Sequence, residues 1–368
     1  MNQLRDSYQN KRIFLTGHTG FKGAWLVQWL HQLGAVVKGY ALKADEPSLF
    51  HAMEGESLCQ SVEGDIRDAQ KLRQELHDFA PDFVFHLAAQ SLVRESYKNT
   101  LYTYETNTLG TANLLEALKG LSKKCTVVII TTDKVYENLE RPDPYVETDR
   151  LGGYDPYSAS KACTEIIANS YRLGFFHPNT YDQHQVAIAT ARAGNVIGGG
   201  DWAVDRLIPD IVRGLEREEP IVLRCPSAVR PWQHVLEPLY GYLLLGLQLQ
   251  ASPVRFGEGW NFGPEISDNL TVEEVVQRSL KVWGSGRYEV QATGDNFHEA
   301  NLLRLDIEKA KQKLGWLPVF SADTAIEKTI AWYRDHLRGI SSARELVSRD
   351  IRLYTQLLEQ RSNQGLRA

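Results

Sequence analysis

Short apolar runs alternate with amphipathic segments through the first half of the chain. The apolar runs that predict buried strands lie at residues 12–16, 35–42, 83–88, 126–131 and 186–191. Apolar residues at helical spacing follow the first run at 24–33 and recur between the third and fourth runs at 107–119. Strands that alternate with helices predict βαβ units and one parallel sheet. We therefore expect an α/β fold with a doubly wound parallel sheet.

The pattern changes after about residue 196. A loop of three glycines and an aspartate, 198–201, is followed by shorter segments that are richer in Trp, Pro and Arg. We therefore predict a first domain over 1–195 and a smaller C-terminal α/β domain over 196–368, with a cleft between them. Ligands of open parallel sheets bind at the carboxyl ends of the strands, so residues that follow the predicted strands are the first candidates for a site.

Composition and charge argue against several classes of protein. The 368 residues carry a formal net charge of −5, which argues against a nucleic-acid-binding surface. The four cysteines are widely spaced and form no CxxC unit, so neither a metal centre nor a disulfide framework is expected. Residues 1–12 are polar, and no apolar run approaches the ~20 residues that span a bilayer. We expect a soluble, cytoplasmic protein without membrane or nucleic-acid partners.

Three glycines mark the turn after the first predicted strand. Gly17, Gly20 and Gly23 end a strand and open a helix, which lets the backbone approach a dinucleotide pyrophosphate. The helix N-terminus adds free N–H groups and a positive dipole end. The same spacing can mark a plain turn, but its context favours a Rossmann-type dinucleotide site in residues 1–195. The predicted cofactor contacts of this turn also include His18, Phe21 and Lys22.

The acidic marker that would identify the dinucleotide is missing. An acidic residue at the end of the second strand would bind the adenosine ribose, but 39–43 holds none, and Asp45 comes later in a loop. NAD is the expected cofactor, NADP is not excluded, and Lys43 would favour a 2′-phosphate. Asp65 and Ile66 are predicted to lie beside the adenine. Asp65 or Asp68 can instead cap a helix.

Tyr157 and Lys161 form the candidate catalytic pair. They are four residues apart on a predicted helix and therefore share one face. A fixed ammonium beside a phenol lowers the phenol pKa, and the phenolate can take a proton from a substrate alcohol. The lysine can also hold a nicotinamide ribose. This spacing is common by chance, and the glycine turn upstream is what makes it informative.

The segment after the fourth strand carries a second set of candidates. Thr132 can supply the hydroxyl with which a simple reductase orients its substrate. A simple reductase does not need Asp133 or Lys134. A protonatable carboxyl beside an amine suggests proton transfer after an oxidation. The alternative is a solvated ion pair on a loop.

With these residues placed, the chain resembles the extended short-chain dehydrogenase/reductases, and among them the nucleotide-sugar 4,6-dehydratases, over nearly its full length. The segments that carry the resemblance are GHTGFKG (17–23), HLAAQSLVRESY (86–97), TYETNTLGTANLLEA (103–117), TTDKVY (131–136), YSASK (157–161), ARAGNVIGGGDWAVDRLIPD (191–210) and RPWQHVLEPLYGYL (230–243). Asp133 and Lys134, together with His18 and Lys22, are typical of the CDP-sugar branch.

The resemblance implies an NAD-dependent lyase that converts CDP-glucose into CDP-4-keto-6-deoxyglucose. Tyr157 would take the proton of the 4-hydroxyl during oxidation at C4. Asp133 would protonate the departing 6-hydroxyl, and the hydride would then return to C6. Such ketosugars feed the dideoxysugars of bacterial surface polysaccharides.

The resemblance also implies further contacts. Cofactor contacts are expected at Leu87, Ala88 and Ala89. The substrate diphosphate is expected at Asn195 and Arg230, since an Arg fork matches phosphate and an Asn amide donates one hydrogen bond. Arg206 is a weaker substrate candidate, with a surface salt bridge as the alternative. Asn107 is expected to brace the active-site backbone rather than to touch substrate.

Two departures from the family pattern stand out. The dTDP-glucose relatives carry Asp-Glu where this chain has Asp133-Lys134, and a protonated lysine is no base. Lys134 takes the C5 proton if its pKa is lowered, or it stabilises the enolate while another group takes the proton. His18 and Lys22 replace small or apolar residues in the glycine turn, and the imidazole is expected to crowd the pyrophosphate and to loosen the cofactor.

Other functions stay open on the residues alone. A nucleotide-sugar 4-epimerase or 4-reductase would use Thr132, Tyr157 and Lys161 without an acid beside Thr132. The same dehydration on another NDP-hexose also fits, because no residue identifies the base. A redox-inactive NAD(P)-sensing regulator would keep the fold, although such proteins usually lose the tyrosine or the lysine. A homodimer or homotetramer is expected if the helices of Asn107 and Tyr157 pair with their copies; alternatively, these helices only cover the sheet.

Overall fold

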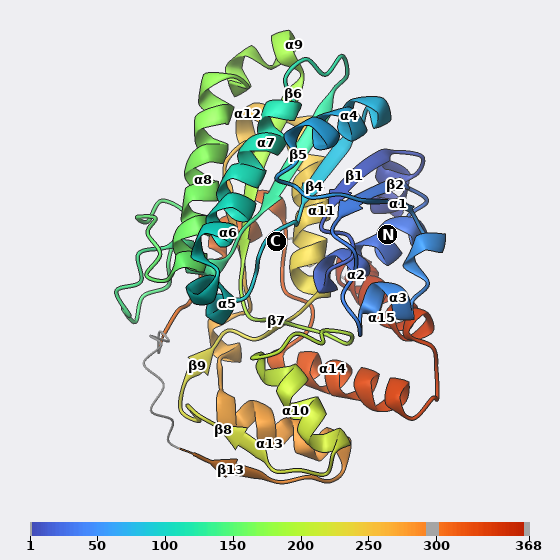
Figure 1. The fold of residues 1–368 in the computed structure, drawn as a ribbon, viewed down its shortest axis with the longest axis vertical. Helices are drawn as coiled ribbons and strands as arrows, with labels where there is room; N and C mark the ends of the chain where they lie inside the picture. Colours follow the sequence, from blue (N-terminus) through green and yellow to red (C-terminus); the bar gives the residue numbers. More distant parts are fainter. Residues whose placement is uncertain (1, 292–301, 364–368) are drawn as a thin grey trace.

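Seven parallel strands form the centre of the described structure (Figure 1). The computed structural model describes residues 2–291 and 302–363, so the outer ends of the two predicted domains, 1 and 364–368, lie outside it. The strand order is β11-β6-β5-β4-β1-β2-β3, and every pairing is parallel. The strands are β1 (Arg12–Thr16), β2 (Val36–Ala41), β3 (Gln60–Glu63), β4 (Phe83–His86), β5 (Cys125–Ile130), β6 (Val186–Ala193) and β11 (Gly259–Phe262).

The central strands send alternate side chains to opposite faces of the sheet. Ile13 and Leu15 of β1 belong to one buried apolar cluster, whereas Phe14 between them belongs to a second cluster. β4 and β5 repeat this alternation. A strand has a period of two, so an all-apolar strand of this kind must be covered on both faces.

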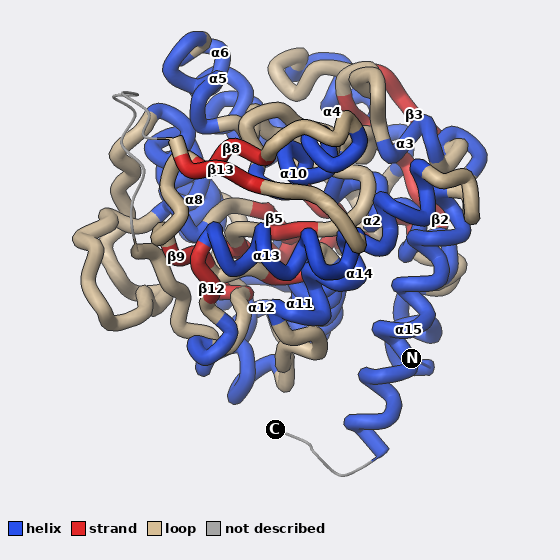
Figure 2. The backbone as a smooth tube through the Cα atoms, turned by 90° about the horizontal axis from the view of Figure 1, so that it is seen from below, coloured by secondary structure: helices blue, strands red, loops and turns tan. Residues whose placement is uncertain are grey.

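Helices provide that cover (Figures 1 and 2). The first cluster includes residues of α1 (Asn2–Tyr8), α2 (Phe21–Gln32), α3 (Leu49–Ala52), α11 (Leu236–Ala251) and α15 (Ala343–Asn363). The second cluster includes residues of α4 (Ala69–Phe79), α7 (Gly110–Ala117) and α8 (Pro156–Gly174). The segment before α7 is helical as well, with α5 (Val93–Lys98), α6 (Thr100–Tyr104) and a π-helical turn, η2 (Glu105–Leu109). α15 packs against α2 at the edge of the molecule (Figure 2).

Much of the chain after β6 forms a smaller layer beside the sheet (Figure 1). It contains α10 (Leu207–Glu216), β8 (Ile221–Leu223), α13 (Val272–Trp283), β13 (Tyr288–Val290) and α14 (Ala322–Leu337). β8 pairs with β13, while α13 contacts both α10 and α14. Two further short pairs are β7 (Val196–Ile197) with β10 (Gln233–His234), and β9 (Val229–Arg230) with β12 (Leu270–Thr271). The remaining short helices are η1 (Gly55–Ser57), η3 (Asp133–Val135), η4 (Pro178–Thr180), α9 (Tyr181–His184), α12 (Pro253–Phe256), η5 (Ile266–Asp268) and η6 (Ala310–Leu314).

The five strands expected from apolar runs are all present, with ends shifted by no more than two residues. The doubly wound α/β fold is therefore confirmed. Two strands of the same sheet, β3 and β11, were not expected. Three elements from beyond residue 195 join the first predicted domain: β11 belongs to its sheet, and α11 and α15 help to cover that sheet. The division of the chain at residue 195 therefore stays a prediction.

The strand order reverses beside β1. The chain proceeds from β1 through β2 to β3 in one direction, and from β4 through β5 to β6 in the other. The carboxyl ends of β1 and β4 therefore flank the reversal point, where parallel sheets of this kind open a crevice for ligands.

Candidate active site

A cavity of about 770 Å³ lies at this reversal point. It is lined by the glycine turn after β1, by residues that follow five other strands of the sheet, and by the beginnings of α8 and α10. Its volume falls within the range of small-molecule sites. Of all residues predicted to touch cofactor or substrate, His18 alone does not line it.

The glycine turn comes too close to its neighbours to carry side chains at two positions. Gly17 has φ +73°, and a Cβ added there would lie 2.7 Å from the Ala88 backbone nitrogen. A Cβ on Gly23 would lie 2.1 Å from the Gly17 carbonyl oxygen. At Gly20, which caps α2, the nearest atom to an added Cβ is the same carbonyl, 3.5 Å away. The turn therefore presents bare backbone and the N-terminus of α2 to the cavity.

The His18 side chain points away from the cavity, contrary to expectation. Its ring is fully buried against Gly39 of β2, and Nε2 lies 2.8 Å from the Ser61 hydroxyl. A Cβ on Gly39 would lie 2.3 Å from the ring, so the missing side chain on β2 makes the room that His18 fills. Burial lowers the His18 pKa to about 4. The expectation that the imidazole crowds the pyrophosphate is therefore wrong.

Lys22 does line the cavity, from the first turn of α2. Burial and, to a smaller extent, the nearby Arg206 lower its pKa to about 8, while Asp133 acts in the opposite direction. Its ammonium group therefore lies close enough to the catalytic candidates to feel their charges.

The far end of the cavity is formed by the segments after β2 and β3. Residues 40–45 and 64–66 line it there, and both Lys43 and Asp45 are among them. Asp65 accepts hydrogen bonds from the Arg67 side chain, and these lower the Asp65 pKa. The N-cap of α4 is Asp68, whose carboxylate accepts from the Lys71 N–H at 3.0 Å. Asp65 is therefore not needed as a helix cap.

The candidate pair Tyr157 and Lys161 lies in the first two turns of α8. Asp155 caps this helix by accepting from the Ser158 N–H at 2.9 Å. Lys161 Nζ donates to the Ile130 carbonyl at the end of β5, at 2.8 Å, and burial lowers the Lys161 pKa to about 8. The two residues are thus fixed against the strand that precedes the second set of candidates.

The expected lowering of the Tyr157 pKa is not found. Burial raises this pKa to about 12, because it disfavours the phenolate. A hydrogen bond with Thr132 and the charge of Arg206 act in the opposite direction, and burial outweighs them.

The Asp133 carboxylate is fully buried directly after β5. The Thr132 hydroxyl donates to Oδ1 at 2.8 Å, and the Asn195 amide donates to Oδ2 at 3.3 Å. Lys134 Nζ lies 3.7 Å from Oδ1, with about a third of its side chain exposed. A Cβ on Gly194 would lie 2.0 Å from Asp133 Cγ, so the carboxyl occupies space that this glycine leaves free. The arrangement is not that of a solvated ion pair on a loop.

Besides Thr132, the other three predicted substrate contacts also reach the cavity. Arg206 donates to Asp201 at 2.7 Å and to the Ser91 hydroxyl at 3.0 Å, so it bridges the segment after β4 and the glycine loop after β7. The ion pair of the alternative interpretation is therefore present, with about a third of the Arg206 side chain exposed. Arg230 lines the cavity from β9. The Asn195 amide donates to Asp133, as described above. Their contacts with a diphosphate stay predictions.

Asn107 braces the backbone as expected. Its side chain accepts from the Gln90 N–H at 2.8 Å and donates to the Gln90 carbonyl at 3.0 Å. It also donates to the Ser160 hydroxyl on α8 at 2.9 Å. This interpretation of Asn107 is confirmed.

Two residues near the catalytic candidates were missed in the sequence. Glu165 on α8 and Arg192 on β6 form a buried ion pair with a separation of 2.8 Å. Glu165 comes four residues after Lys161 on the same helix, and Arg192 interrupts the apolar strand 186–193. Charged side chains are rarely buried without a partner. A charged residue at a position that is expected to be buried, as at these two residues, therefore indicates an ion pair.

Two negative findings hold within residues 2–291 and 302–363. No helix there is long and apolar enough to cross a membrane. No group of three or more His, Cys, Asp and Glu side chains there is placed to hold a metal ion.

The geometry agrees with comparisons to known proteins. The chain is 47% identical, over 347 residues, to CDP-glucose 4,6-dehydratase of Salmonella typhimurium, with 93% of this chain and 97% of that one covered. Among solved structures, dTDP-glucose 4,6-dehydratase of Streptomyces venezuelae, with NAD bound, matches with a TM-score of 0.76 and 27% identity, covering 89% of this chain and 98% of that one. An epimerase of Methanothermobacter thermautotrophicus matches in fold, with a TM-score of 0.77 and 22% identity, covering 92% and 96%. Residues 14–329 match the family model described as GDP-mannose 4,6 dehydratase, and the chain belongs to this family.

Proposed function

We propose that this protein removes water from CDP-glucose and so forms CDP-4-keto-6-deoxyglucose. The observation that carries the proposal is the buried Asp133 carboxylate, bonded to Thr132 in the cavity that also holds Tyr157 and Lys161. An alcohol oxidation needs only the hydroxyl, the phenol and the lysine, so the buried carboxyl supports a second proton transfer. The Salmonella relative with 47% identity bears the name of this activity.

The cavity fits NAD as the cofactor. The bare backbone at Gly17 and Gly20 and the N-terminus of α2 suit a pyrophosphate, and Lys161 suits the nicotinamide ribose. Lys43 and Asp45 both line the far end of the cavity, so the charges there do not distinguish NAD from NADP. The solved Streptomyces relative is described with NAD bound. When bound, NAD accepts the hydride from C4 of the sugar and returns it to C6.

Tyr157 accepts the proton of the sugar 4-hydroxyl at its phenolic oxygen. Arg206 favours the phenolate that this requires, and so does a hydrogen bond from Thr132, whose single hydroxyl proton turns from Asp133 to the phenolic oxygen, against the effect of burial. The Thr132 oxygen can at the same time accept a hydrogen bond from the sugar. Arg206 and Arg230 line the cavity as cations that match the substrate diphosphate.

Asp133 and Lys134 act after the oxidation. The 4-ketone acidifies the hydrogen at C5, and loss of water then requires an acceptor for that proton and a donor for the departing 6-hydroxyl. In the proposed step Asp133 gives its carboxyl proton to the departing 6-hydroxyl, from a position fixed by its contacts with Thr132 and Asn195. Lys134, 3.7 Å from Asp133, takes the C5 proton or stabilises the enolate. A proton returns to C5 when the hydride reaches C6.

The competing functions lack support at particular positions. A 4-epimerase or 4-reductase has no use for the buried Asp133 carboxyl beside Thr132. A regulator that only senses the cofactor would not need Tyr157 and Lys161, which both line the cavity. The choice of CDP over another nucleotide is supported by the name of the Salmonella relative.

A homodimer or homotetramer is the proposed assembly. Large apolar side chains on α6, η2 and α8 are more than half exposed in the single chain: Leu101, Leu109, Ile166 and Leu173. These helices lie side by side. Pairing with a second copy would cover these side chains.

The cytoplasm is the proposed location. All four cysteines fall within the described residues, and each is a free thiol. Free thiols are typical of a reducing compartment.

The proposal is tested by incubation of the pure protein with CDP-glucose and NAD⁺, followed by product mass and the ketosugar chromophore in alkali. Loss of one water without net reduction of NAD⁺ supports it. A product of unchanged mass would indicate an epimerase. Turnover with dTDP-glucose but not with CDP-glucose would keep the chemistry and overturn the assignment of the nucleotide.

A further inference from the structure

The catalytic segment, residues 131–136, is tied at both ends to one buried ion pair. At its start, the Thr131 hydroxyl donates to Glu165 Oε1 at 2.5 Å. At its end, Arg192 Nη1 donates to the Tyr136 phenolic oxygen at 2.8 Å. Arg192 Nη2 and Glu165 Oε2 close the link at 2.8 Å. Thr132, Asp133 and Lys134 lie between these two attachments.

The ion pair is almost completely shielded from water. The exposed fractions of the Arg192 and Glu165 side chains are 6% and 4%. Glu165 also accepts from the Thr190 hydroxyl at 2.7 Å. Burial alone would raise the Glu165 pKa, but Arg192 and the hydroxyl donors hold it below its ordinary value. A buried ion pair often adds little to the free energy of unfolding. We therefore expect this pair to serve the geometry of the site instead.

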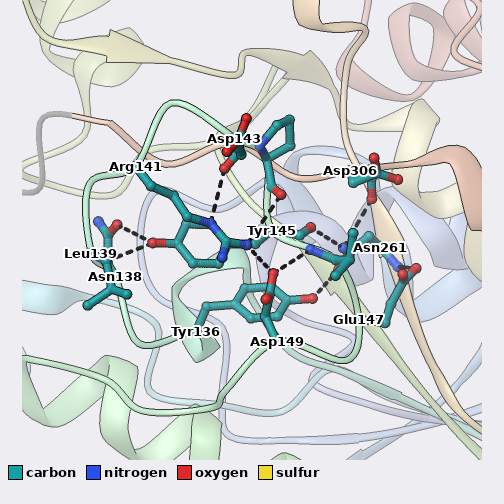
Figure 3. A network of polar contacts seen from close by, with 12 residues as sticks. Tyr136, Asn138, Leu139, Arg141, Asp143, Tyr145, Glu147, Asp149, Asn261 and Asp306 are labelled. Atoms are coloured by element: carbon teal, nitrogen blue, oxygen red, sulfur yellow. Dashed lines mark hydrogen bonds and ion pairs between the residues drawn. The ribbon is translucent and has the colours of Figure 1, made fainter.

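The link continues from Tyr136 into two other parts of the chain (Figure 3). Tyr136 donates to Asn261 Oδ1 at 2.7 Å, and Asn261 is part of strand β11. Asn261 in turn donates to the carbonyls of Tyr145 and Asp306, at 2.9 and 3.1 Å. The end of the catalytic segment is therefore fixed to the edge strand of the sheet as well as to α8.

We propose that Glu165 and Arg192 are positioning residues that hold Thr132 and Asp133 in place against Tyr157. Glu165 lies on α8, the helix that carries Tyr157 and Lys161, so the ion pair sets the catalytic segment directly against the helix of the candidate base. The inference rests on the proposed function, because it assigns the elimination step to Asp133 and Lys134 of the segment and the oxidation step to Tyr157 and Lys161 of the helix, with Thr132 serving both.

Loosening the ion pair should therefore impair the two steps unequally. Lys161 is held independently by the Ile130 carbonyl, and Tyr157 is held by the capped start of α8. Asp133 depends on the segment. Thr132 moves with the segment, so a variant with a displaced segment oxidises C4 more slowly, but it loses both Asp133 and Lys134 from the elimination and is slowed there more, so reduced nicotinamide accumulates during turnover.

The test uses three variants of the NAD-loaded enzyme. Glu165→Gln removes the charge, Arg192→Lys removes the fork that reaches Tyr136, and Tyr136→Phe removes only the bridging hydroxyl. We expect kcat to fall about 10- to 100-fold in the first two with KM changed less than about threefold, and less steeply in the third. In each variant, near-ultraviolet absorbance of reduced nicotinamide rises during turnover above the wild-type level.

The matched control is Glu237→Gln. Glu237 on α11 is also a buried carboxylate, and it accepts from the Phe320 N–H at 2.7 Å and the Tyr354 hydroxyl at 2.8 Å, outside the cavity. This variant should lose stability without accumulating reduced nicotinamide. Equal behaviour of Glu165→Gln and Glu237→Gln would show a structural role only and overturn the proposal.

A second readout does not depend on the reaction. Amide hydrogen exchange of residues 131–136 should accelerate in Glu165→Gln and Tyr136→Phe, but not in Glu237→Gln. If wild-type enzyme forms no ketosugar, the proposed function fails while hydrogen exchange still tests the positioning. If wild-type enzyme dehydrates CDP-glucose and the variants match it in both readouts, only the positioning role fails.

Discussion

The positions of two side chains at or beside this site depend on glycines next to them. Gly39 makes the space that His18 fills, and Gly194 makes the space that Asp133 fills. The buried Asp133 carboxyl can adopt its position only while Gly194 has no Cβ. Steric room of this kind is a property of the folded site rather than of any motif.

Gly194→Ala should displace Asp133 and lower kcat about 100-fold, because the new methyl would lie 2.0 Å from the Asp133 carboxyl carbon. Steady-state kinetics with CDP-glucose measure this. The control is Gly174→Ala at the end of α8, where an added Cβ meets nothing within 4 Å. An unchanged kcat in Gly194→Ala would show that Asp133 does not need this position.

Lys134→Met should lower dehydration at least about 100-fold and leave binding of CDP-glucose nearly unchanged, because the amino group serves the elimination step. Ketosugar formation and titration calorimetry measure the two quantities. Lys123→Met is the control, since Lys123 has a similarly exposed side chain but pairs with Asp82 at 2.7 Å, away from the cavity. Near-normal turnover in Lys134→Met would remove this lysine from the mechanism.

Every site residue predicted from the sequence except His18 lines the cavity, but the direction of each side chain could not be predicted. Tyr157 and Lys161 are four apart on one helix, and that spacing alone places them on one face. The direction of His18 depends on Gly39, a residue of another strand. The Tyr157 pKa depends on burial by parts of the chain that no local pattern brings together.

At the scale of elements, long apolar runs were predictable and short or polar ones were not. β1, β4, β5 and β6 are continuous buried runs, and each was expected within two residues of its ends. β3 has four residues, QSVE, and is largely exposed, so its sequence resembles a loop. β11 follows β6 by more than sixty residues. The two strands pair through backbone hydrogen bonds, which do not depend on side chains and so could not be predicted from the sequence.

Glu237 links α11 to α15 and should make stability depend on pH. Burial raises the Glu237 pKa to about 7, above its ordinary value of 4.5. The folded state therefore binds more protons than the unfolded state between these values, so stability falls as pH rises from about 4.5 to about 7, by about 3 kcal/mol. Urea unfolding across this range should show a smaller fall in Glu237→Gln. An equal fall in both proteins would contradict this contribution.

At the scale of the whole molecule, two features of the described surface bear on function. One is the cavity, and the other is the apolar face, the set of exposed apolar side chains on α6, η2 and α8. α8 belongs to this face and also carries Tyr157 of the site. Assembly through this face would therefore place the catalytic helix at a subunit interface.

Ile166→Glu combined with Leu173→Glu should convert the assembly into smaller species, because two charges would be buried at the proposed interface. Light scattering after size-exclusion chromatography gives the mass. The control is Val254→Glu, because this side chain is 63% exposed and belongs to α12 rather than to the helices of this face. An unchanged mass in the double variant, or a monomeric wild-type protein, would rule out this interface.

The central claim is that one hydride leaves C4 of the sugar and returns to C6 while water is lost between C5 and C6. The most direct measurement uses CDP-glucose deuterated at C4 and locates the label in the product by mass and NMR. The account predicts a product lighter by one water, with the deuterium at C6. A product that keeps the mass of the substrate and retains the deuterium at C4 would contradict it.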